Sequence, residues 1–424
     1  MPHRRVQDIL GYACLLNIVT FYSFYLPGML LTEFAKSLPS SFLFSMTSFL
    51  VGFIVRPFGA LCLGALADRK TRLEGLRVSA LLIGFSSCLV CLVPDSSHWT
   101  YYVLRVVQGF ALGGCYPILS VIIYEAAPST HRGLYTGLFQ TSVPAGYLFA
   151  LAVTIVSKLL IGEENFLQNG WRTAFIYSAL IFPAWWQLHK LLANVEYHDH
   201  PEISRWDFIR LKDWTVQEKK CAVYALLMAT ALGSIAIMGV NIKGFFLKSM
   251  LHLDPLTANH VIAYSTLFYT PTYALWGTLA DRVGPRKVSK RGLIAGIILI
   301  LPLFKLFEIS AQGGNIVPFS VPWFSIFGVS VAISMIATAC FGPFVMLVCN
   351  LVHHEHRCTL YGLSYNIATG VIGGTAYLIS FYVFENTHTL YGGIIYILSL
   401  AALAGIAATL YRKRNAQHFE DLVK

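Results

Sequence analysis

The chain has 424 residues, of which 56% are hydrophobic and only 12% are charged, and its mean hydropathy is +0.62. A soluble domain carries about 25% charged residues, so the composition excludes an ordinary soluble protein and indicates an integral membrane protein. The formal net charge of +10 does not indicate nucleic-acid binding, because the lysines and arginines lie in short loops between apolar runs.

Twelve apolar runs are long enough to cross a membrane, which takes about 20 residues each. The predicted spans cover roughly residues 10–32, 42–66, 74–94, 99–124, 134–160, 172–193, 222–247, 257–280, 289–308, 322–350, 358–384 and 390–411. The longest polar segment, 194–221, falls between the sixth and seventh spans. We therefore predict an all-α membrane protein with two pseudo-symmetric six-helix bundles, 1–193 and 222–424, joined by a cytoplasmic linker.

The basic residues are distributed unevenly between the two sides. The termini and the loops after even-numbered spans hold most of them, whereas the opposite loops hold few, such as Lys36, Lys158 and Lys248. This bias predicts that both termini are cytoplasmic. The first apolar run is too long for a cleavable signal, and we expect a bacterial inner membrane protein. The cysteines show no metal-ligand spacing outside the apolar runs, so no metal site is expected.

A charged loop occurs twice, half a chain length apart. Gly64-Ala-Leu-Ala-Asp-Arg-Lys-Thr-Arg72 follows the second span, and Gly277-Thr-Leu-Ala-Asp-Arg-Val-Gly-Pro-Arg-Lys287 follows the eighth. An aspartate just past a helix end, followed by arginine, can form a charge network that holds the two halves together on the cytoplasmic side. Plain positive-inside anchoring is the alternative. The predicted gating residues are Asp68, Arg69, Arg72, Asp281 and Arg282.

The repeated loop resembles the cytoplasmic loop motif of the major facilitator superfamily, although Thr71 replaces its usual glycine and Pro285 interrupts the second basic run. Further motifs resemble the metabolite–proton symporter branch, which includes proline/betaine, dicarboxylate, citrate and 2-oxoglutarate carriers. They are Arg56-Pro-Phe-Gly59, Arg105-Val-Val-Gln-Gly-Phe-Ala-Leu-Gly-Gly114, Glu125-Ala-Ala-Pro128, Arg132-Gly133, Trp171-Arg172, Arg357, Tyr361-Gly362, Tyr365-Asn366 and Gly373-Gly-Thr375. The resemblance implies alternating access and proton symport.

Two arginines, Arg56 and Arg105, lie inside predicted spans, where ionisable residues are functional candidates. Arginine suits a carboxylate substrate because its guanidinium donates paired hydrogen bonds; a structural ion pair is the alternative reading. Other polar residues at predicted cavity depth are further substrate-binding candidates, although most aromatic residues in such a chain pack or face lipid. They are Asn17, Tyr22, Tyr25, Gln108, Gln140, Tyr365 and Asn366. Lys243, near an outer span end, is expected to snorkel outward.

Proton coupling needs a group that titrates near working pH. Thr20, Ser23 and Cys115 stand where relatives in the resembling branch commonly carry acids, which weakens the symport prediction and permits exchange or uniport. It also favours an anionic substrate. The remaining acids near membrane depth, and hence the proton-coupling candidates, are Glu33, Glu125 and Glu308.

The sequence contains no nucleotide-binding loop and no nucleophile–base pair inside the spans, so we predict neither an enzyme nor an ATP-driven pump, and no cofactor. The function predicted is secondary transport of a small metabolite, a carboxylate or a zwitterion, by a monomer in the bilayer with proton symport. A proton-independent exchanger or facilitator is one alternative. A non-transporting membrane receptor or scaffold is an alternative of another class.

Overall fold

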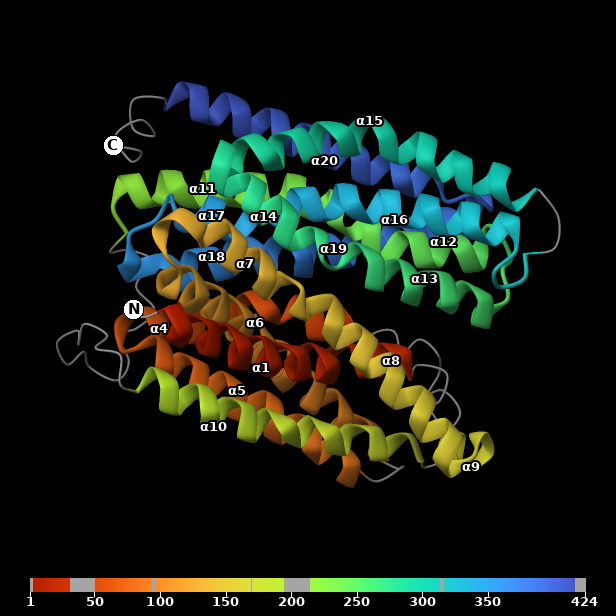
Figure 1. Cartoon of the computed structure of the whole chain (residues 1–424), viewed down its shortest axis with the longest axis horizontal. Helices are drawn as coiled ribbons and strands as arrows, with labels where there is room; N and C mark the ends of the chain where they lie inside the picture. Colours follow the sequence, from red (N-terminus) through yellow and green to blue (C-terminus); the bar gives the residue numbers. More distant parts are fainter. Residues whose placement is uncertain are drawn as a thin grey trace. The chain divides into compact units, whose positions relative to one another are not determined.

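The computed structural model describes residues 3–30, 50–93, 97–168, 170–193, 214–312 and 316–415, and within these ranges the secondary structure is helical throughout, with no β-strand. Ten helices in the described ranges are long and apolar enough to cross a membrane. The predicted all-α membrane fold is therefore confirmed (Figure 1).

Two of the predicted spans, the sixth and the eighth, are not among these ten because they are divided into shorter helices. The sixth consists of the 3₁₀ segment Gly170–Leu180 followed by α10 (Ile181–Leu192). The eighth divides into α13 (Pro255–Tyr269) and α14 (Thr272–Val283), which part at Pro271. Proline has no backbone N–H, so it removes a helical hydrogen bond and breaks the helix at this point. Neither half of these spans meets the length of an uninterrupted membrane helix by itself.

The chain divides into two compact units, each of which includes a short segment from the other half of the sequence. Unit 1 contains residues 1–127, 141–213 and 353–366. Its described helices are α1 (His3–Met29), α4 (Arg56–Arg69), α5 (Arg72–Leu89), η1 (Val90–Leu92), α6 (His98–Ala126), α8 (Ser142–Ile161), α9 (Glu163–Gln168), Gly170–Leu180, α10, η6 (His354–His356) and α18 (Arg357–Asn366). In this unit α4 and α5 pack on α6, α1 packs on α8 and α10, and α18 packs on α4.

Unit 2 contains residues 128–140, 214–352 and 367–424. Its described helices are η2 (Ser129–His131), α7 (Arg132–Gln140), α11 (Val216–Ile237), the π-helix η5 (Met238–Ile242), α12 (Lys243–Ser249), α13, α14, α15 (Pro285–Ala311), α16 (Val321–Phe341), α17 (Phe344–Cys349), the π-helix η7 (Ile367–Ile372), α19 (Gly373–Thr387) and α20 (Tyr391–Arg414). Here α15 and α13 pack on α16, α11 packs on α20, and α7 packs on α14.

Small residues let α4 and α6 approach closely. A Cβ atom on Gly59 would lie 1.8 Å from the carbonyl oxygen of Phe110, and one on Gly113 would lie 2.1 Å from that of Arg56. No side chain larger than hydrogen fits at either position. Close backbone approach through small residues is the common way in which membrane helices associate.

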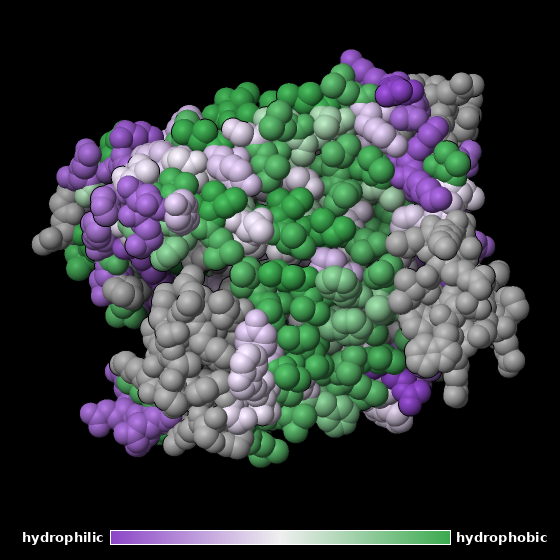
Figure 2. Space-filling model, turned by 180° about the vertical axis from the view of Figure 1, so that it is seen from behind, coloured by the Kyte–Doolittle hydropathy of each residue, from purple (hydrophilic) through white to green (hydrophobic). Residues whose placement is uncertain are grey.

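Many large apolar side chains lie on the surface of the helices. Leu159 and Leu160 on α8 are 80% and 78% exposed, and Leu403 and Leu410 on α20 are 67% and 60% exposed. Figure 2 shows that hydrophobic side chains cover much of the visible surface. Such a surface is unfavourable in water and suits contact with lipid.

Candidate functional site

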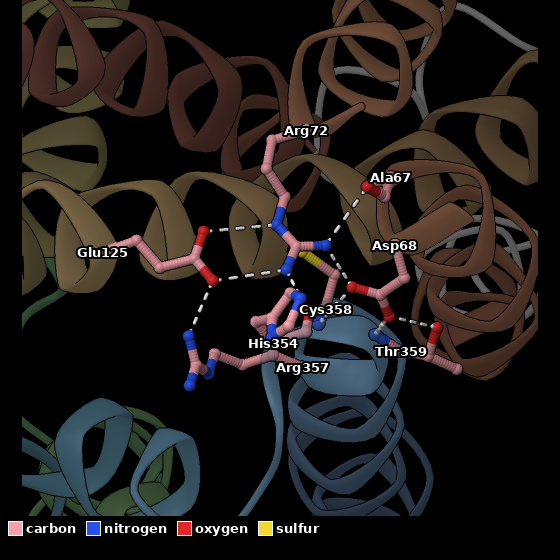
Figure 3. A network of polar contacts seen from close by, with 8 residues as sticks. All are labelled: Ala67, Asp68, Arg72, Glu125, His354, Arg357, Cys358 and Thr359. Carbon is pink, nitrogen blue, oxygen red and sulfur yellow. Dashed lines mark hydrogen bonds and ion pairs between the residues drawn. The ribbon is translucent and has the colours of Figure 1, made fainter. Parts of the chain in front are cut away.

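In unit 1, Asp68 near the end of α4 caps the first turn of α18 (Figure 3). Its Oδ1 accepts a hydrogen bond from the backbone N–H of Cys358 at 2.9 Å, and its Oδ2 accepts one from that of Thr359 at 2.8 Å. The Thr359 hydroxyl also donates to Oδ2 at 2.7 Å. The first N–H groups of a helix have no partner within the helix and attract negative charge, so a carboxylate fits there.

Arg72, the first residue of α5, connects Asp68 with Glu125. It donates to Asp68 Oδ1 and to the Ala67 carbonyl on one side. On the other side its Nε and one terminal nitrogen donate to the two carboxylate oxygens of Glu125 at 3.3 and 3.2 Å. Figure 3 shows this paired geometry, in which the planar guanidinium lies between two carboxylates.

Arg357 completes the arrangement from the start of α18. It donates to Glu125 Oε1 at 2.7 Å, and Arg72 also donates to the carbonyl oxygen of His354. We call Asp68, Arg72, Glu125 and Arg357 the Asp68 network. Asp68 and Arg72 are only 4% and 6% exposed, and the network balances two carboxylates against two guanidinium groups. A buried charge set of this kind is stable only while every member keeps its partners.

In unit 2, Asp281 near the end of α14 binds the start of α7 in the same way. Its Oδ1 accepts from the Gly133 N–H at 2.6 Å and its Oδ2 from the Leu134 N–H at 2.8 Å. α14 and α7 touch closely, since a Cβ on Gly133 would lie 2.2 Å from the Gly277 oxygen. Both aspartates of the repeated loop therefore cap a helix that begins with arginine.

Sequence reasoning missed the partners of the two aspartates, although a signal was present. Residues 131–137 read His-Arg-Gly-Leu-Tyr-Thr-Gly, and residues 356–362 read His-Arg-Cys-Thr-Leu-Tyr-Gly. These two His-Arg starts are a second repeat between the halves, and each is the helix start that an aspartate caps. Of the other gating candidates, Arg69 is half-buried at the end of α4 and Arg282 is exposed.

The two departures from the loop motif are both compatible with a helix start. Thr71 is extended, with φ of −144°, and its hydroxyl caps α5 by accepting from the Glu74 N–H at 3.1 Å. Gly284 has φ of +93°, a left-handed conformation that glycine adopts without steric cost, and Pro285 then opens α15 where its missing N–H is not needed.

Arg56 and Arg105, two buried arginines of unit 1, lie around one aromatic ring. The guanidinium carbon of Arg56 lies 4.0 Å from the ring centre of Phe24, and that of Arg105 lies 5.1 Å from it. Arg56 is 4% exposed and Arg105 is fully buried. Arg105 donates to Gln108 Oε1 at 2.6 Å, and Gln108 donates to the Ser87 hydroxyl at 3.1 Å, which holds the guanidinium in a fixed orientation.

Most of the other substrate-binding candidates also lie in unit 1. Asn17 donates to Ser142 at 2.7 Å, and its buried side-chain oxygen has no hydrogen-bond partner among the described residues. Tyr25 contacts the ring of Tyr147, with centres 5.8 Å apart. Tyr22 uses its hydroxyl to donate to the Ala174 carbonyl, which indicates a packing role.

The α18 candidates and Gln140 divide between the units. The Tyr365 ring packs in a tilted arrangement on that of Tyr116, with ring centres 4.6 Å apart, and Asn366 donates to the Gly113 carbonyl at 3.0 Å, both within unit 1. Gln140 lies in unit 2, where it donates to the Phe341 carbonyl at 3.3 Å. The sequence did not show that Gln140 belongs to a different unit from the other substrate-binding candidates.

Two of the three proton-coupling candidates, Glu125 and Glu308, lie within the described residues, and each is paired with a basic residue. Glu125 belongs to the Asp68 network, between two arginines. Glu308 pairs with Lys305 on the same helix at 2.5 Å. Glu33 lies outside the described residues.

Thr20, Ser23 and Cys115, which replace the acids common in the resembling branch, form neutral contacts. Thr20 Oγ1 lies 3.8 Å from Cys115 Sγ, and the Ser23 hydroxyl donates to that of Ser178 at 2.8 Å. Two of the departures noted in the sequence, Thr20 and Cys115, thus touch each other. In the described part of unit 1, the side chains of Thr20, Ser23 and Cys115 therefore contact neutral polar groups.

Comparison with known proteins identifies the family. A citrate–proton symporter of Klebsiella pneumoniae is 27% identical over 420 residues, covering 94% of this chain and 90% of the relative. An ectoine/proline transporter of Corynebacterium glutamicum is 24% identical, covering 96% and 84%. These relatives confirm the predicted metabolite–proton symporter branch. The crystal structure of a bacterial homologue of the iron transporter ferroportin, in an outward-facing state, has a TM-score of 0.70 at 12% identity and covers 96% and 99% of the two chains, which shows a shared fold.

A family model described as Major Facilitator Superfamily matches residues 11–235, more than half of the chain. The chain therefore belongs to the Major Facilitator Superfamily and is a secondary transporter related to citrate–proton symporters.

Proposed function

We propose that the chain transports a small organic carboxylate or zwitterion by alternating access, together with protons. The observation that carries the substrate class is the pair of buried arginines around Phe24, Arg56 and Arg105. A carboxylate accepts two parallel hydrogen bonds from one guanidinium, which gives both affinity and orientation. The named substrates of the two relatives, citrate, ectoine and proline, all carry a carboxylate.

Arg105 is the better placed of the two arginines to bind substrate. Its bond to Gln108 and that of Gln108 to Ser87 fix the guanidinium before a ligand arrives, so little side-chain entropy is lost on binding. Arg56 lies between the rings of Phe24 and Phe53, at 4.0 and 4.3 Å, where cation–π attraction holds it. We assign Arg105 to the substrate and Arg56 to support.

The capped helix starts are the proposed gates. Asp68 holds α18 and Asp281 holds α7, so each bond set ties a helix start to a loop from the other half of the sequence. We propose that both sets form in the outward-facing state, where they close the cytoplasmic side, and break when the carrier opens inward. The proposed setting is a bacterial inner membrane, with both termini cytoplasmic and the protein acting as a monomer.

Uptake into proteoliposomes tests this proposal. Radiolabelled citrate and proline are supplied outside, with and without an inward-directed proton gradient. We expect one of them to accumulate only with the gradient, and Arg105→Gln to lower that uptake about 100-fold, as for two lost charge-assisted hydrogen bonds. Arg77→Gln is the matched control, since Arg77 is an exposed arginine paired with Glu74 at 3.5 Å.

The alternatives give different results. Uptake that does not respond to the gradient would replace symport by exchange or facilitated diffusion, which the neutral Thr20–Cys115 contact favours. A carrier that moves neither probe, and in which Arg105→Gln changes no flux or thermal shift with di- and tricarboxylates, would refute the carboxylate proposal and leave a receptor or scaffold.

A further inference from the structure

One cation in unit 2 is buried although the sequence predicted that it would reach outward. Lys243 opens α12 directly after the π-helix η5, and it is 1% exposed. A π-turn widens a helix locally and frees backbone carbonyls, and such turns are frequent at functional sites. The Gly239 carbonyl in η5 is bonded by the hydroxyl of Ser334, at 3.0 Å. The chain therefore departs from regular helix just before this lysine.

The shell around the Lys243 amine consists of neutral groups. Nζ donates to the Ser334 hydroxyl at 2.7 Å and to the Ser265 hydroxyl at 3.1 Å. It lies 5.1 Å from the ring centre of Tyr269. Ser330 donates to Ser265 at 2.9 Å. Among the described residues no carboxylate contacts Lys243, so no fixed negative charge compensates an ammonium there.

This shell accommodates both protonation states of the amine. Ser265 and Ser334 donate their own hydrogens to the carbonyls of Ile262 and Gly239, so each offers a lone pair to Nζ. A neutral amine has two N–H donors and satisfies both serines. An ammonium has a third N–H, which meets the electron-rich face of Tyr269. Neither state leaves a buried donor without an acceptor, which is unusual for a buried lysine.

Other charged or titratable groups on the neighbouring helices do not reach Lys243. α16 contains no Asp, Glu, Lys, Arg or His. The charged or titratable residues on α11, α12, α13, α15, α19 and α20, besides Tyr269, include Glu218, Lys219, Lys220, Lys248, His260, Tyr264, Lys305, Glu308, Glu385 and Tyr391. In the described structure none of them bonds or pairs with the amine.

We propose that Lys243 is the residue that binds and releases the coupled proton, an inference that rests on the proposed symport. In one half-cycle the Nζ–H bond breaks, the electron pair stays on nitrogen and the proton passes to a water molecule, which becomes hydronium; in the other the amine lone pair takes a proton from hydronium, which becomes water. Asp68, which is buried, and Glu125, which is half-buried, do not offer this, because both are bound in the Asp68 network. Among the residues that the structure describes, Lys243 has no charged partner to hold it in one state.

Lysine NMR tests the protonation directly and needs no substrate. In the full-length protein in nanodiscs with ¹³Cε-labelled lysine, the Lys243 signal is the one missing from Lys243→Met. We expect it to shift between about pH 5 and 9, the range useful for coupling, and the signal of exposed Lys248 on the same helix serves for comparison. Ser334→Ala should move the midpoint by up to about one pH unit. A Lys243 signal that is constant over this range, or a midpoint unmoved in Ser334→Ala, refutes the proposal.

Transport by the same variants separates coupling from substrate binding. We expect Lys243→Met to keep citrate or proline exchange within about threefold but to lose gradient-driven accumulation, and Lys248→Met to keep both. Accumulation that survives in Lys243→Met refutes only the role of Lys243. Exchange and binding lost together would make Lys243 a substrate ligand instead. Wild-type exchange without accumulation would refute symport itself, and the lysine proposal with it.

Discussion

Replacing Asp68 by asparagine tests the proposed gate most directly. The carboxylate uses both oxygens, Oδ1 for Cys358 and Oδ2 for Thr359. An amide has one oxygen, so in Asp68→Asn an NH₂ group must face a backbone N–H at 2.8 or 2.9 Å, and that buried donor loses its acceptor. The charge opposite Arg72 is lost as well.

The magnitude follows from these losses. An unsatisfied buried donor costs about 1–3 kcal/mol, and the weakening of a charge-assisted bond adds about 1 kcal/mol. A total of about 3 kcal/mol lowers the population of the capped state by about 100-fold. Because we propose that the carrier revisits this state in every cycle, the maximal rate should fall steeply, whereas substrate affinity should change by less than about threefold.

The assay compares the rate of citrate or proline uptake in proteoliposomes with binding of the same compound to purified protein. Asp254→Asn is the matched control: Asp254 also caps a helix, but it is exposed and accepts from Leu256 and Thr257 through the single oxygen Oδ2, which an amide can replace. If binding affinity falls in proportion to the uptake rate, Asp68 acts on substrate binding and not on the gate, and the reasoning is refuted.

Two further predictions concern the second loop and the helix packing. Asp281→Asn should slow uptake by only about tenfold, because Asp281 also uses both oxygens but pairs with no arginine among the described residues; an effect as large as that of Asp68→Asn would contradict this difference. Gly59→Ala should lower the free energy of unfolding by about 1–3 kcal/mol in a thermal-unfolding assay, because its Cβ would lie 1.8 Å from the Phe110 oxygen, whereas Gly11→Ala, with open space around it, should not.

The sequence determined the class of fold and the repeated loop. Hydropathy and loop charge are local properties, so the helical membrane fold could be predicted from the sequence, and ten of the twelve predicted spans contain a helix long and apolar enough to cross a membrane in the described residues. The aspartates at 68 and 281 could also be found, because a repeat is visible in one dimension. The sequence does not show which helix each aspartate caps, because Asp68 and its partner Thr359 are 291 residues apart in the chain.

Only the tertiary structure decided which polar groups meet. Hydropathy gives the depth of a residue in a span but not the direction in which its side chain points, so Lys243 was expected to reach outward and is instead buried between Ser265 and Ser334. Glu125 was a proton-coupling candidate by its depth alone, and the structure places it between Arg72 and Arg357. Packing sets the rotation of each helix about its axis, and that rotation assigns the buried charges to their partners.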